Sequence, residues 1–168
     1  MTKTKVNSFL NNLIKQTAWE SNYQSQLNLN INFGKPHLRI TKRKGKNDLA
    51  TVRGEWWLWI FYANWKIKNF DNSNASIFSS YKRISIALSR INGQKLLSIK
   101  FISKTGITNF TFNRGSVLTV IPFEHRQSDL WSIYHKKSVL SVQSDGRYYI
   151  GKSSLDKKPK FRSLDELL

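Results

Sequence analysis

The sequence has 168 residues, no cysteine and a net charge of +18, with 28 Lys and Arg against 10 Asp and Glu. The lack of cysteine excludes disulfides, thiolate zinc sites and a thiol nucleophile. No apolar run approaches the roughly 20 residues of a membrane-spanning helix, and no signal-peptide core is present, so we expect a soluble cytoplasmic protein.

The first predicted element is an amphipathic helix over residues 2–19. Its apolar stripe consists of Val6, Phe9, Leu10, Leu13, Ile14 and Ala18 at helical spacing. We expect this stripe to dock on the core; a helix that binds a partner or a membrane surface is the alternative.

Strand patterns follow the helix. Apolar residues alternate with Gln and Asn over 27–33, which predicts a half-buried strand that ends at Gly34 to Pro36. Residues 38–42 and 49–52 predict two short strands around a flexible basic hairpin tip.

A Trp-rich segment over 55–70 predicts one long central strand, with a bend near Ala63 and Asn64 as a variant. Trp57, Trp59 and Trp65 share one parity. We expect at least two of the three to be largely buried, because large aromatic side chains usually fill a core. Exposed stacking of nucleic-acid bases is the alternative.

The C-terminal half predicts a short helix over 78–91, which Asn92-Gly93 would end, and then an antiparallel meander or sandwich. Six strands are expected, at 96–102, 108–112, 117–121, 130–134, 139–142 and 148–150. The fold class is therefore α+β or mainly β. One domain is expected over 1–151, with a β-rich core over 26–150 and a basic, mobile tail over 152–168.

Catalytic chemistry has little support in the sequence. His37, His125 and His135 lie in three separate turn regions, and none has a second His at metal-ligand spacing. Glu124, His125 and Asp129 share one loop and could form a carboxylate–histidine pair, but a solvated turn is the simpler interpretation. We expect no catalytic residue, no metal and no cofactor.

Two short motifs look like pieces of nucleases. Residues 148–152 match the second half of the GIY-YIG signature, but the first half is missing upstream. Asp156-Lys157-Lys158 matches the bare Asp-x-Lys of restriction-type enzymes, but it lies in a polar tail. A nuclease is therefore only a distant alternative.

The basic residues are unevenly distributed. Residues 35–46 and 72–123 contain no acid, and we expect these two stretches to form one contiguous surface for a polyanion. The candidate polyanion-binding residues are Lys35, Arg39, Lys42, Arg43, Lys44, Lys46, Lys82, Arg83 and Arg90.

Residues 55–150 resemble a group of small uncharacterised bacterial β-rich proteins, which also carry a Trp-rich strand ahead of a short helix. The segments that carry the resemblance are 55–65, 92–96, 108–112, 114–115, 130–131, 139–140 and 144–148. The resemblance implies a β-rich fold and carries over no activity or site residue.

The charge favours non-enzymatic binding of an acidic macromolecule, either nucleic acid or an acidic protein. The alternative is an immunity or antitoxin-like protein that inhibits a toxin through a sheet face. Salt separates the two, because phosphate-driven binding weakens steeply as salt rises.

Overall fold

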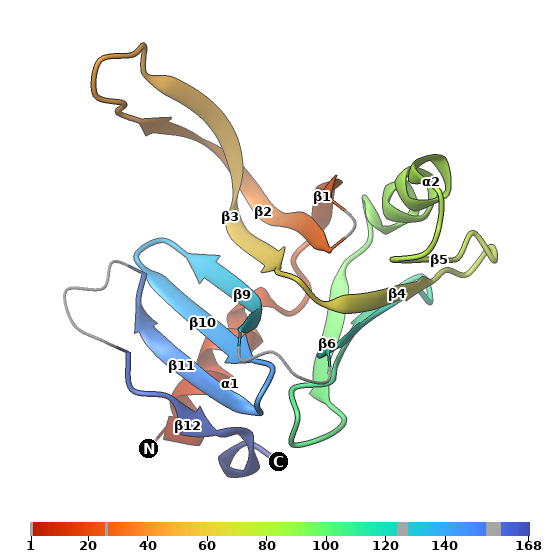
Figure 1. Ribbon diagram of the computed structural model, residues 1–168, viewed down its shortest axis with the longest axis vertical. Coiled ribbons are helices and arrows are strands. Elements are labelled where there is room, and N and C mark those ends of the chain that lie inside the picture. The colour runs from red at the N-terminus through yellow and green to blue at the C-terminus, as the bar shows by residue number, and fades with distance from the viewer. Residues whose placement is uncertain (1, 26, 124–127, 154–158) are drawn as a thin grey trace.

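The computed structural model describes the whole chain except residues 1, 26, 124–127 and 154–158 (Figure 1). Its helices are α1 (Thr2–Leu13), α2 (Tyr81–Ile91) and a 3-10 turn, η1 (Leu164–Glu166). Its strands are β1 (Ala18–Ser25), β2 (Asn28–Thr41), β3 (Leu49–Ile60), β4 (Asn64–Lys68), β5 (Ala75–Ser76), β6 (Leu96–Phe101), β7 (Thr108–Phe112), β8 (Val117–Ile121), β9 (Asp129–His135), β10 (Ser138–Gln143), β11 (Arg147–Lys152) and β12 (Arg162–Ser163). The antiparallel, strand-rich architecture confirms the predicted fold class.

The described strands form two antiparallel sheets. The larger sheet has the strand order β1-β2-β3-β9-β10-β11-β12, and the smaller has the order β5-β4-β8-β7-β6. The Trp-rich segment begins in β3 and continues into β4, and β4 already belongs to the smaller sheet. The chain therefore crosses between sheets directly after β3.

The core lies on the inner face of the larger sheet, where helix α1 and the smaller sheet cover it. On β3 this inner face carries Trp56, Leu58 and Ile60, each no more than 2% exposed. Phe9 of α1 packs edge-on against Trp56, with ring centroids 5.0 Å apart. From the other sheet, the ring of Phe110 lies 5.4 Å from that of Trp131 on β9.

The N-terminal helix is shorter than predicted. Helix α1 ends at Leu13, Lys15 adopts a left-handed φ of 72°, and the chain then enters β1. The N–H of Ala18 donates to the carbonyl of Gln94 at 2.8 Å, so backbone bonding to the segment before β6 replaces the expected last helical turn. Tertiary pairing here overrides the local helical pattern.

The Trp-rich segment is two strands rather than one. Residues 61–63 break the ladder, Tyr62 has a φ of 31°, and the strands on either side belong to different sheets. The break shifts the alternation of buried and exposed residues. Trp65 is fully buried as predicted, but Trp57 and Trp59 lie half-buried on the outer face, and Trp56 takes the core position instead.

The C-terminal strands and α2 agree with the predicted ranges to within two or three residues. The end of the expected mobile tail is docked: β12 pairs with β11, and Leu164 is fully buried. The apolar residue in this acidic segment explains the docking, because its side chain joins the core cluster. No helix in the described ranges is long and apolar enough to cross a membrane.

Candidate functional site

A long arm formed by the far ends of β2 and β3 projects from the molecule (Figure 1). Every residue from Lys35 to Ala50 is exposed, whereas Leu29 to Phe33 on the same strand are buried. The arm therefore carries the basic hairpin tip that the sequence predicts, but as the end of two long strands rather than of two short ones. The prediction that the strand ends at Gly34 to Pro36 is wrong, because these residues form a bulge within β2.

The bulge fixes how the arm leaves the sheet. The pairing register shifts between Phe33 and Pro36, and Gly34 adopts a φ of 73°, which glycine tolerates far better than other residues. The carbonyl of Gly34 accepts a hydrogen bond from Trp19 Nε1 at 2.8 Å. On β3, a Cβ added at Gly54 would lie 2.6 Å from the carbonyl oxygen of Phe33, so this close approach requires glycine.

The strand register gives the arm two chemically different faces. Cross-strand partners lie on one face of a ribbon, and successive residues alternate between faces. One face is aliphatic and pairs Leu38 with Val52 and Ile40 with Ala50. The opposite face is polar and basic and pairs His37 with Arg53, Arg39 with Thr51 and Thr41 with Leu49.

A groove of about 640 Å³ lies at the base of the arm, on the outer face of the larger sheet. Residues of the basic face of the arm line it, and so does Lys136 in the β9–β10 turn. The side chains that line the groove include His37, Arg39, Arg53, Glu55, Trp57, Trp59, Tyr134 and Lys136. The groove thus combines cations with half-buried aromatic rings.

The aromatic side chains form a row across β3 and β9. The ring centroid of Trp57 lies 5.0 Å from that of Tyr134, its cross-strand partner, and 5.1 Å from that of Trp59. Phe61 continues the row, 4.1 Å from Trp59. Asn30 fixes the position of Trp57, because its Oδ1 accepts a hydrogen bond from the indole Nε1 at 2.9 Å.

Arg53 joins the cationic and aromatic parts of the groove. Its guanidinium carbon lies 4.6 Å from the ring centre of Trp57, a cation–π contact. Two buried donors in the groove, Arg53 Nε and Trp59 Nε1, have no hydrogen-bond partner among the described residues. Because leaving a buried donor unpaired costs about 1–3 kcal/mol, an acceptor supplied by a ligand would stabilise this site.

The titratable groups of the groove favour an anion. Among the described residues that line the groove, Arg39, Arg53 and Lys136 accompany one carboxylate, Glu55, whose Oε1 lies 3.5 Å from His135 Nε2. Burial raises the pKa of the Tyr134 phenol, so this ring stays neutral at physiological pH. The groove therefore offers positive charge and neutral aromatic surface together.

The structure separates the predicted binding residues into two groups. Lys35, Arg39 and the tip residues Lys42, Arg43, Lys44 and Lys46 all lie on the arm. Lys82, Arg83 and Arg90 lie on α2, which packs against β1, β4 and β5 away from the arm tip (Figure 1). The arm tip and α2 therefore do not lie next to each other (Figure 1), and a contiguous polyanion surface over the two acid-free stretches stays a prediction.

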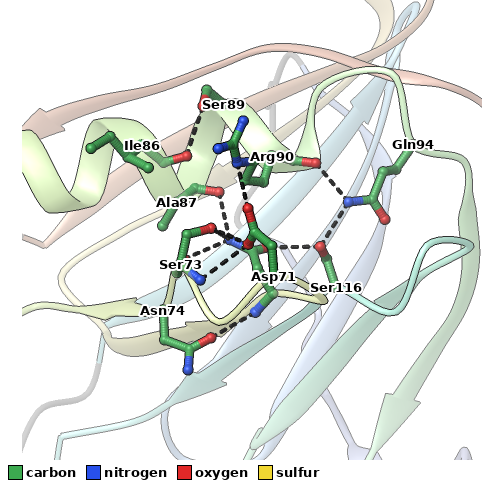
Figure 2. Close-up of polar contacts among 10 residues, drawn as sticks. Asp71, Ser73, Asn74, Ile86, Ala87, Ser89, Arg90, Gln94 and Ser116 are labelled. Carbon is green, nitrogen blue, oxygen red and sulfur yellow. Dashed lines mark hydrogen bonds and ion pairs between the residues drawn. The ribbon is translucent and has the colours of Figure 1, made fainter.

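Two of the α2 residues already have intramolecular partners. Arg90 Nε lies 2.7 Å from Asp71 Oδ2, and Arg83 Nε donates to the carbonyl of Asn74 at 2.7 Å. Figure 2 shows Arg90 turned toward Asp71 above the loop that carries Ser73. Two hydrogen bonds from Ser73, and then the charge of Arg90, lower the pKa of Asp71.

Beneath this ion pair lies a buried polar network. Ser116 Oγ donates to Asn69 Oδ1 at 2.6 Å and accepts from Gln94 Nε2 at 2.7 Å (Figure 2). Asn69 Nδ2 donates to the carbonyl oxygens of Ala87 and Ser73. The cluster ties α2 to the β4–β5 loop, so we assign it a structural role.

The aromatic side of the site was predicted only as the alternative of exposed base stacking, because burial of the Trp residues was the favoured interpretation. Both parities of β3 are rich in apolar residues, so hydrophobicity alone did not distinguish the two faces. One signal was present: Arg53 and Glu55 share the parity of Trp57, and charged residues mark the solvent face of a strand. Tyr134 and Lys136 come from β9 and its turn, and only the β3–β9 pairing brings them to the site.

The structure does not test the candidate carboxylate–histidine pair, because part of its loop lies outside the described residues. No group of three His, Asp and Glu side chains among the described residues could hold a metal ion. Glu124 and His125 lie outside the described ranges, as does Asp156 of the Asp-x-Lys motif. Residues 148–152 belong to β11, a regular strand within the larger sheet.

Comparison with protein-family models, curated proteins and solved structures finds no match to this chain. The resemblance of residues 55–150 to small bacterial β-rich proteins therefore stays a prediction. The function is therefore inferred from the groove and the arm themselves.

Proposed function

We propose that this protein is a non-enzymatic nucleic-acid-binding module that holds a single strand in the groove at the base of the arm. The observation that carries the proposal is the position of the aromatic row of Trp57, Trp59 and Tyr134. It lies in the same groove as Arg39, Arg53 and Lys136. Proteins that bind single strands combine a cationic path for the backbone with aromatic rings for the bases.

The groove residues divide into two roles. The aromatic row would contact unstacked bases, which present a π-face whatever their sequence. Arg53 and Trp59 would donate their unpaired Nε and Nε1 hydrogens to phosphate or base oxygens, and Arg39 and Lys136 would neutralise the backbone. Binding would therefore tolerate many sequences.

An acidic protein is the rival ligand, and the aromatic row weighs against it. Positive charge on the arm would attract either polyanion. A row of half-buried rings beside cations provides stacking surfaces for bases. An interface with a protein, whether acidic or a toxin, usually centres on a fully buried apolar core. A cationic groove lined by half-buried aromatic rings fits the first description better.

The direct test measures binding of a fluorescently labelled single-stranded oligonucleotide by anisotropy at low salt, with wild type and Trp57→Ala. Loss of one stacking partner is expected to weaken binding about tenfold. Phe78→Ala is the matched control, because Phe78 is an aromatic residue with 86% exposure on the segment before α2, away from the groove. Circular dichroism confirms that both variants fold.

Two results would contradict the proposal. One is the absence of binding by the wild type at low ionic strength. The other is an equal loss in the Phe78 control, which would indicate non-specific contact. Intrinsic tryptophan fluorescence gives a second measure, because a strand in the groove should quench Trp57 and Trp59.

A further inference from the structure

The aliphatic face of the arm is a second exposed surface, opposite the one that faces the groove. Leu38 is 62% exposed, Ile40 60% and Val52 50%, and their register places them together on one side of the ribbon. None of them belongs to the core cluster. A row of exposed branched side chains on a projecting ribbon is typical of a contact surface.

The charge of the arm limits what can cover this face. Residues 35–53 carry seven Lys and Arg and one acid, Asp48. A second copy of the chain docked face to face would bring two such arms together, so like charges would oppose the contact. A polyanion would meet the same cations with attraction.

We propose that the arm docks in the major groove of a B-form DNA duplex, with its aliphatic face toward the base edges. This inference rests on the proposed function in taking nucleic acid as the ligand, but it concerns a different face and a different form of the ligand. The B-form major groove is about 12 Å wide and admits a two-stranded ribbon. Leu38, Ile40 and Val52 would contact thymine methyl groups and other apolar parts of the base edges.

The dimensions and the cations of the arm fit this geometry. The paired part runs from Pro36 opposite Gly54 to Thr41 opposite Leu49, a length of about 17 Å at strand spacing. It covers roughly half of the 34 Å helical repeat of duplex DNA. Lys42, Arg43, Lys44 and Lys46 at the tip can then reach the phosphates on the groove walls.

The geometry also predicts discrimination between duplexes. An A-form RNA duplex has a deep, narrow major groove that side chains cannot read. The arm should therefore bind a DNA duplex at least tenfold more tightly than an RNA duplex of the same sequence. A purely electrostatic surface would show a smaller preference, because both duplexes carry phosphates.

The test uses the full chain and the triple variant Leu38→Thr, Ile40→Thr and Val52→Thr, which places a β-branched side chain at all three positions and keeps all charges. Anisotropy is measured with three probes: a DNA duplex, an RNA duplex and a DNA single strand. The variant is expected to lose about tenfold in affinity for the DNA duplex, to keep its affinity for the single strand, and to keep the salt dependence of duplex binding. The substituted positions are solvent-exposed, so folding is expected to be unchanged.

The outcomes separate the two proposals. The docking of the arm is overturned if the protein binds the single strand but does not prefer the DNA duplex over the RNA duplex. It is also overturned if the triple variant binds the DNA duplex as tightly as wild type. Both results leave the groove proposal intact. Failure of every probe to bind overturns both. A dimer of the wild type in sedimentation that the triple variant abolishes would show that a second copy covers the face, and this result also overturns the inference.

Discussion

The two halves of the β2–β3 hairpin share one backbone ladder and differ in what surrounds them. In the half near Leu58, the inner side chains are buried in the core, where Phe9 of α1 packs on Trp56. In the half near Leu38, both faces of the ribbon are exposed. Isolated two-stranded ribbons are only marginally stable in water. The exposed half thus contributes little to folding, and we interpret its residues in terms of binding.

The largest expected effect comes from the same substitution in the two halves. Leu58→Ala should lower the free energy of unfolding by about 2–5 kcal/mol, because it opens a cavity in the core. Leu38→Ala should change it by less than about 0.5 kcal/mol, because the side chain has no core contact to lose. Urea denaturation of both variants measures the difference. Similar losses in the two would contradict the division of the hairpin.

The neck between the two halves is expected to be sensitive in a different way. A Cβ in Gly54→Ala would collide with the backbone of Phe33, so we expect a loss of about 1–3 kcal/mol together with weaker binding as the arm is displaced. Gly115→Ala is the control. Its φ of 87° makes the change strained, but the nearest atom to an added Cβ is Phe70 Cβ at 3.7 Å, an ordinary contact, and Gly115 lies between β7 and β8 in the smaller sheet. Binding should be unchanged in the control once folding is accounted for.

Much of this fold could be predicted from local patterns. The strands at Thr108–Phe112 and Val117–Ile121 have the predicted bounds, because turn residues and clear alternation define both ends. The assignment of the face of β3 failed because the break at Tyr62 shifts the phase. The groove could not be predicted from spacing, since it depends on β3 pairing with β9, more than 70 residues further along the chain.

The polar cluster around Asp71 provides a smaller test, in a region far from the arm. In the folded protein, Ser73 and Arg90 lower the pKa of the Asp71 carboxyl, which therefore lies below the unfolded value of roughly 4. The stabilisation is therefore complete above that value and is lost as the pH falls through the folded pKa. In Asp71→Asn, the free energy of unfolding measured by urea denaturation should fall less steeply as the pH is lowered (the acid limb of the pH profile). Binding at neutral pH should be unaltered. An unchanged acid limb would show that the ion pair contributes nothing.

The most direct test of the central claim, that the arm and the groove at its base are the binding region, compares two triple charge variants with equal net charge. One removes Arg43, Lys44 and Lys46 at the tip by changing each to Gln. The other changes Lys66, Lys68 and Lys82 to Gln, three exposed positions on β4 and α2 away from the arm. The measurement is the slope of log affinity against log salt for a labelled single strand. We expect the tip variant to flatten the slope by up to about two units, at about 0.7 per lost phosphate contact, and the distant variant to leave it nearly unchanged. Equal flattening in both variants would contradict the claim and show that the positive charge acts as a diffuse field over the whole surface.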